Sequence, residues 1–162
     1  MRPDPVGGDL FYGPDQAIIH HENFGKLAKI AAEDVVSLLQ GAGLSEGTVV
    51  DLGCGSGILA RTLSEAGCDV LGVDISPAMI ELAKRNAPRA SFRVGSLLDA
   101  ELPRAVAVTA IGEALNYATD PRAGLGELER LAGRVHGALE PGGVFPPPIP
   151  GWKVILGRKP AV

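Results

Sequence analysis

The stretch VVDLGCGSG, residues 49–57, decides the fold of this chain. Its apolar start leads into Asp51, and glycines then occupy every second position until a helical pattern begins near Ile58. A second apolar run, VLGVDIS at residues 70–76, leads into Asp74. This order predicts a strand, a tight turn, a helix and a second strand. The two aspartates would then lie at neighbouring strand ends, where open α/β sheets bind their ligands.

The glycines of this turn favour a bound ligand. Gly53, Gly55 and Gly57 have no Cβ, so the backbone can adopt positive φ and a ligand can lie directly on it. The first N–H groups of the following helix have no partner within the helix and carry the positive end of its dipole. We therefore expect an anion or a zwitterion at this turn. Asp74 offers two coplanar oxygens, which suit the two adjacent hydroxyls of a ribose.

Three classes of nucleotide ligand compete for a glycine-rich turn of this kind. A phosphate loop requires GxxxxGK[ST], and no lysine follows these glycines, which excludes that class. The dinucleotide fingerprint is GxGxxG, and Ile58 stands where its last glycine belongs, so a nicotinamide cofactor is disfavoured but stays open. The remaining pattern, GxGxG followed by Asp74, resembles motif I and the acidic loop of class I S-adenosylmethionine-dependent methyltransferases.

The resemblance extends over roughly residues 10–145 and implies a Rossmann-like fold that binds S-adenosyl-L-methionine. Ser96 stands where the family often has an aspartate, and its hydroxyl could reach the adenine amino group. The segment AVTAIGEALNY at 107–117 is similar to a subgroup with AIGE after the fourth strand, in a loop that passes beneath the cofactor. The cofactor-binding residues that the resemblance implies are Asp51, Gly53, Cys54, Gly55, Ser56, Gly57, Asp74, Ile75, Met79, Ser96, Leu97, Ile111, Gly112 and Glu113.

Several of these positions also suit an ordinary structural role. Ser76 and Pro77 form a good helix start, and we expect Ser76 to be the N-cap, which leaves Asp74 for the ligand. Asp51 could simply cap the turn. Met79 is more typical of a core residue than of a cofactor contact, and Cys54 is typical of a small filler in the loop.

The rest of the chain alternates between helical and strand patterns. Apolar residues at helical spacing predict a helix over 24–40 that ends at Gly41. The alternating order predicts an α/β fold with a doubly wound parallel sheet. Its expected strands are 48–52, 69–73, 91–94 and 105–110, and its further helices are 57–66, 77–86 and 122–139. We divide the chain into an N-terminal arm or lid at 1–23, a core at 24–145 and a proline-rich tail at 146–162.

The C-terminal strands are incomplete in comparison with the seven-stranded sheet of the family, whose last two strands form an antiparallel hairpin. Four prolines within residues 146–150 interrupt a fifth strand that begins at Val144. Residues 152–156 carry a run of β-forming residues and could add one short strand. We expect this segment to cover the sheet edge of its own chain or of a second copy, so a homodimer is one expected outcome.

Composition and charge narrow the classes of function. A chain of 162 residues with a net charge of −4 and no Lys/Arg cluster is typical of one domain without a nucleic-acid partner. Two cysteines and three histidines predict neither a metal site nor a disulfide framework, which favours the reducing cytoplasm. No apolar run is long enough to span a bilayer, and the N-terminus lacks the pattern of a signal peptide.

The resemblance implies methyl transfer to a small-molecule acceptor that the sequence does not identify. Displacement at a sulfonium chiefly needs an aligned nucleophile and the exclusion of water, so a catalytic side chain is optional. His20, His21 and Glu113 are candidate bases, and Tyr117, with Asn116 beside it, is a candidate partner of the acceptor. The histidine pair equally suits a solvated helix start. The alternatives are a cofactor-binding module without turnover and a nicotinamide-dependent oxidoreductase.

Overall fold

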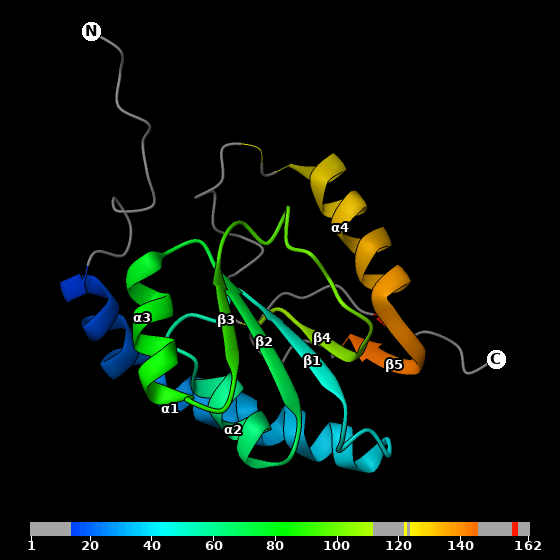
Figure 1. Ribbon diagram of the computed structural model, residues 1–162, viewed down its shortest axis with the longest axis horizontal. Helices are drawn as coiled ribbons and strands as arrows, with labels where there is room; N and C mark the ends of the chain where they lie inside the picture. The colour runs from blue at the N-terminus through cyan, green and yellow to red at the C-terminus, as the bar shows by residue number, and fades with distance from the viewer. Residues whose placement is uncertain (1–13, 112–121, 123, 146–156, 159–162) are drawn as a thin grey trace, which may run out of the picture.

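The described part of the molecule is a six-stranded sheet with helices on both faces (Figure 1). The computed structural model describes residues 14–111, 122, 124–145 and 157–158, without the side chains of residues 14, 16–24, 27, 157 and 158. The strand order is β3-β2-β1-β4-β5-β6, with β1 to β5 parallel and β6 antiparallel to β5. The strands are β1 (Thr48–Leu52), β2 (Asp69–Asp74), β3 (Ser91–Val94), β4 (Ala105–Thr109), β5 (Leu139–Phe145) and β6 (Gly157–Arg158). The helices are α1 (Pro14–Gly41), α2 (Ile58–Glu65), α3 (Pro77–Asn86) and α4 (Leu125–Ala138). The predicted doubly wound sheet is confirmed.

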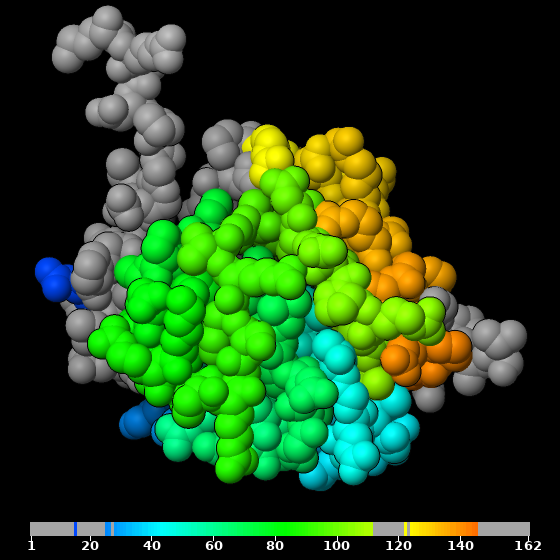
Figure 2. Space-filling model, in the orientation of Figure 1, coloured from blue at the N-terminus to red at the C-terminus, as the bar shows by residue number. Residues whose placement is uncertain are grey.

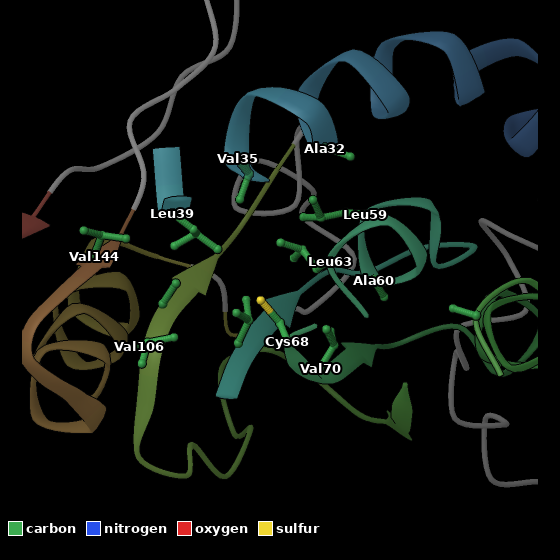
Figure 3. Packing of buried hydrophobic residues seen from close by; sticks show 13 residues of the cluster. Ala32, Val35, Leu39, Leu59, Ala60, Leu63, Cys68, Val70, Val106 and Val144 are labelled. Carbon is green, nitrogen blue, oxygen red and sulfur yellow. The ribbon is translucent and has the colours of Figure 1, made fainter. Parts of the chain in front are cut away.

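Each face of the sheet has its own hydrophobic core. Successive residues of a strand point to opposite faces, so Val49 packs with α1 and α2 whereas Val50 packs with α4. Figure 3 shows side chains of α1 and α2, among them Leu39 and Leu63, converging on the strands of the first face. Leu63 is fully buried, and burial of a leucine side chain contributes about 1.5–3 kcal/mol. These two cores hold the central strands, and therefore the strand ends, in a fixed arrangement.

Two helices begin elsewhere than the sequence predicts. α1 begins at Pro14 and not at residue 24. A proline at the first helical position has no N–H that needs a partner, and Asp15 in the first turn suits the helix dipole. α4 begins at Leu125 and not at residue 122, because Gly124 is fully extended with φ −166° and ψ 170°.

The fifth strand is longer and less regular than predicted. It starts at Leu139 rather than Val144, and its register with β4 shifts between two pairs, Ala105 with Leu139 and Ala107 with Val144. Gly142 has a φ of 81°, so the chain can bulge where Pro141 and two glycines interrupt the ladder. β6 then pairs with the end of β5. The predicted short strand at 152–156 lies outside the described residues.

The opposite edge of the sheet is β3, which lies at the molecular surface. Residues of α3, β3 and the connection to β4 form much of the face seen in Figure 2, where they are green. Val94 at the end of β3 has 53% of its surface exposed. The ligand-binding edge predicted from the sequence lies further inside the sheet, at the carboxyl ends of β1, β2 and β4.

Candidate cofactor site

Polar side chains from three strands meet on one face of the sheet. Asp51 of β1 is in register with Gly72 of β2 and with Thr109 of β4. Because side chains alternate along a strand, Asp74 shares the face of Gly72. The predicted proximity of the two aspartates is confirmed, since the charge of Asp74 raises the pKa of Asp51. The shared face is the one that α1 and α2 cover.

The loop between β1 and α2 has the predicted left-handed glycines. Gly53, Gly55 and Gly57 have φ values of 72°, 51° and 79°. A Cβ on Gly57 would lie 3.0 Å from Ala83 of α3, whereas a Cβ on Gly55 would meet no atom of the described residues within 4 Å. Gly57 is therefore required for helix packing, and Gly55 borders open space that a ligand can approach.

Asp74 connects the glycine loop to the start of α3. Its Oδ2 accepts a hydrogen bond from Gly55 N–H at 2.9 Å, and its Oδ1 accepts one from Ser76 N–H at 2.9 Å. Ser76 is the N-cap of α3, as predicted, because its hydroxyl accepts a hydrogen bond from Met79 N–H at 3.3 Å. The two backbone donors fix the plane of the Asp74 carboxylate at the rim of the loop.

Asp51 is a buried carboxyl group in a polar cluster. It is 2% exposed, and its Oδ1 accepts a hydrogen bond from the Thr109 hydroxyl at 2.8 Å. Burial raises the pKa of Asp51 from 3.8 to about 7; Thr109 opposes this rise and the charge of Asp74 adds to it. Among the described residues no cation lies within ion-pair distance of Asp51. A buried carboxylate without a counter-charge is a favourable place for a cationic ligand group.

Cys54 fills the space beneath the loop. It is buried, and burial together with the charges of Asp51 and Asp74 raises the pKa of its thiol. A side chain on Gly72 would collide both with Cys54 Sγ, at 2.9 Å, and with the ring of Phe92. The thiol therefore stays protonated at neutral pH and acts as a small packing group.

α3 also holds the glycine loop from its far end. The Asn86 side chain donates a hydrogen bond to the Ser56 carbonyl at 2.9 Å. Neither Asn86 nor Thr109 is among the residues that the sequence predicted for the site. Both lie far along the chain from their partners. Asp51 is the fourth residue of β1 and Thr109 is the fifth residue of β4, so only the observed register of the two strands places them on one face.

The turn after β3 lies beside Asp74. Gly95 N–H donates to the Asp74 carbonyl at 2.9 Å, and the Ser96 hydroxyl accepts from Leu98 N–H at 3.1 Å. Arg134 of α4 donates to the Leu98 carbonyl and thereby ties this turn to the helix.

The remaining predicted residues differ in their surroundings. Ile75, Leu97 and Ile111 are half-buried, whereas Met79 is 2% exposed and matches the core interpretation. His20 and His21 belong to α1, but their side chains are not described. Gly112, Glu113, Asn116 and Tyr117 lie outside the described residues.

In the described ranges of the chain, no three His, Cys, Asp or Glu side chains gather closely enough to hold a metal ion. No helix there combines the length and the apolar character needed to cross a membrane.

Comparison with known proteins finds similarity to methyltransferases. Residues 49–143 match the family described as "Methyltransferase domain". The magnesium-protoporphyrin O-methyltransferase of Rhodobacter capsulatus is 38% identical over 96 residues, which are 56% of this chain and 42% of that protein. The ribosomal protein L11 methyltransferase of Tolumonas auensis is 30% identical over 147 residues, which are 88% of this chain and 45% of that protein. The chain thus spans less than half the length of these relatives.

Solved structures share the fold. The structure of S-adenosylmethionine-bound CalS10, an amino pentose methyltransferase of Micromonospora echinaspora, has a TM-score of 0.67 at 22% identity. The similarity covers 94% of this chain and 62% of that one. At this identity the likeness concerns the fold alone.

Proposed function

Because this chain belongs to the methyltransferase-domain family, we propose that it binds S-adenosylmethionine and transfers the methyl group to a small-molecule acceptor. The observation that carries the proposal is the Asp74 carboxylate, which two backbone N–H groups hold beside the open space at Gly55. This arrangement presents a fixed diol acceptor next to a turn that can receive a zwitterion.

The amino-acid part of the cofactor belongs at the glycine loop in this proposal. The N-terminus of α2 has Gly57 as N-cap and no side-chain cap, so its backbone N–H groups can receive the carboxylate. Asp51, buried beside the loop, supplies the negative charge for the ammonium group. A cation there relieves the repulsion between Asp51 and Asp74.

The nucleoside part belongs between β2 and β3. Asp74 accepts hydrogen bonds from the ribose hydroxyls, and Ile75 and Leu97 supply half-buried apolar surface for the adenine. Ser96 and Ile111 border the same edge, and Gly112 and Glu113 complete the set that the family resemblance implies. Met79, which is buried in the core, packs beneath this proposed adenine-binding surface.

Methyl transfer needs little from the protein beyond the correct placement of the cofactor and the acceptor. The bound cofactor supplies an activated methyl group on a sulfonium, with a thioether as leaving group. The chain's residues hold that group in one orientation and exclude water from it. The candidates for contact with the acceptor stay His20, His21, Glu113, Asn116 and Tyr117. A base is required if the acceptor atom is an oxygen or nitrogen that must lose a proton.

Binding of S-adenosylhomocysteine, measured by isothermal titration calorimetry, tests the cofactor site. Replacement of Asp74 by Ala should weaken binding by about 1.5–3 kcal/mol, the scale of hydrogen bonds to a charged group. Asp69→Ala is the matched control, because Asp69 is an exposed carboxylate at the opposite end of the same strand. Unchanged affinity of Asp74→Ala would contradict the assignment, and binding of NAD by the wild type would favour an oxidoreductase.

A labelled methyl donor offered with a panel of small nucleophiles tests turnover. Methyl transfer to one of them would establish the acceptor class. Tight S-adenosylhomocysteine binding without any transfer would favour the second candidate, a binding module without turnover. That candidate is supported by β6, which has only two residues in the described part of the chain.

We further propose a cytoplasmic protein without a nucleic-acid partner, which can form a homodimer through its C-terminal sheet edge. The free Cys54 and Cys68 suit a reducing compartment, and the net charge of −4 disfavours phosphate backbones. Light scattering distinguishes monomer from dimer.

A further inference from the structure

The Thr109 hydroxyl is a buried polar group that the proposed function does not yet use. Thr109 is the last residue of β4 and is 1% exposed. Its Oγ1 lies 2.8 Å from Asp51 Oδ1 and 3.4 Å from the Val50 carbonyl oxygen. A hydroxyl has one proton to donate, and only the shorter distance falls in the normal range for an O–H···O bond. The proton of Thr109 is therefore directed at the Asp51 carboxylate.

The surroundings of Asp51 make this single donor important. The titratable groups that face Asp51 from the described residues are Asp74 at the end of β2 and the Cys54 thiol in the loop. Asp74 repels a negative charge on Asp51, and the thiol stays neutral. β4 contributes Thr109, whose hydroxyl is the only side-chain donor to Asp51 among the described residues. Protonation of Asp51 would reverse this bond, because the carboxylic acid would then donate to Thr109 Oγ1.

We propose that Thr109 is a positioning residue for the cofactor, which keeps the Asp51 carboxylate ionised and oriented toward the cofactor's ammonium group. This inference rests on the proposed function, which places that ammonium group at Asp51. It adds that β4 controls the pH range in which the amino-acid part of the cofactor binds. The hydrogen bond from Thr109 to Asp51 lowers the carboxyl pKa and so opposes the effect of burial.

Substitution of Thr109 by Val removes the hydroxyl donor and keeps the side-chain packing, so it tests the hydroxyl alone. Valine has the same branched shape, so it fills the same space on β4 without a donor. Thr109→Ser is the matched variant, because it keeps the donor and loses only a methyl group. Circular dichroism and thermal unfolding verify that each variant folds, and Thr109→Ala replaces Thr109→Val if that variant does not.

Calorimetric titration between pH 6 and pH 9 with two probes tests the inference. S-adenosylhomocysteine carries the ammonium group, whereas methylthioadenosine has the nucleoside and the sulfur but no amino-acid part. For the wild type, S-adenosylhomocysteine affinity should rise as the pH passes about 7, where Asp51 ionises. Thr109→Val should move this rise in affinity to higher pH and weaken binding roughly tenfold at pH 7. Thr109→Ser keeps the hydroxyl and should therefore bind S-adenosylhomocysteine as the wild type does. Methylthioadenosine affinity should be the same for all three proteins at every pH.

Three results would overturn the inference. An unchanged pH profile for Thr109→Val would show that the hydroxyl does not act on Asp51. An equal loss of affinity for methylthioadenosine would show a merely structural role for Thr109. No binding of S-adenosylhomocysteine by the wild type would overturn the proposed function and this inference together, whereas the first two results overturn only the inference.

Discussion

Replacement of Asp51 by Asn should make the protein more stable at alkaline pH while it weakens cofactor binding. Asp51 is buried beside a second aspartate, and no cation among the described residues compensates it. Asparagine has the same shape and can still accept the hydrogen bond from Thr109, but it carries no charge. The variant therefore removes an unfavourable buried charge and also removes the proposed partner of the ammonium group.

The direction of the pH effect follows from the pKa of Asp51 in the two states. Folding raises this pKa from 3.8 to about 7. Between these pH values the unfolded chain has released the proton and the folded chain still holds it, so wild-type stability falls as pH rises. The loss amounts to about 4 kcal/mol by pH 7 and stays constant above it. The buried amide of asparagine needs a hydrogen-bond partner of its own, and the cost of burying it offsets part of this loss of about 4 kcal/mol. The expected gain in the free energy of unfolding is therefore about 1–3 kcal/mol at pH 8.

Urea unfolding at pH 5, 6, 7 and 8 measures this difference. The stability advantage of Asp51→Asn should grow with pH through the pKa of Asp51 at about 7, where half of the carboxyl groups are ionised, and then level off above it. Asp69→Asn, at the exposed amino end of β2, is the control for loss of one negative charge. The reasoning is refuted if the wild type is the more stable protein at pH 8, or if the difference between the two is the same at every pH.

Three further predictions concern the loop and the tail. Gly55→Val should abolish S-adenosylhomocysteine binding while the fold survives, because a Cβ there meets no atom of the described residues within 4 Å but enters the proposed ligand space at a φ of 51°. Tight binding by the folded variant would place the cofactor elsewhere. Gly57→Ala should instead lower the free energy of unfolding by about 1–3 kcal/mol, because its Cβ would lie 3.0 Å from Ala83, and unchanged urea unfolding would contradict this. Deletion of residues 146–162 removes β6 and exposes the end of β5. Light scattering and thermal unfolding should then show association or lower stability, and a monomer of unchanged stability would show that the tail contributes nothing.

The sequence by itself determined the local parts of the site. The alternating glycines, the aspartate at the end of β2 and the Ser76 cap all lie within one strand–helix–strand unit. Their geometry depends on backbone preferences and on contacts between near neighbours, which the residue types specify directly. The prediction of an open α/β sheet and of a ligand at its carboxyl edge follows from the same unit.

Only the tertiary structure decided the contacts that join distant segments. Thr109 reaches Asp51 because β4 lies beside β1 in the sheet order, and Asn86 reaches Ser56 because α3 packs on the glycine loop. The register shift between Leu139 and Val144 of β5 is likewise set by pairing with the neighbouring strand β4. Such contacts are set by strand order, register and helix packing, which depend on the burial of two whole cores. Thr109, which we propose keeps Asp51 ionised, thus lies on β4, far along the chain from the motif that first identified the site.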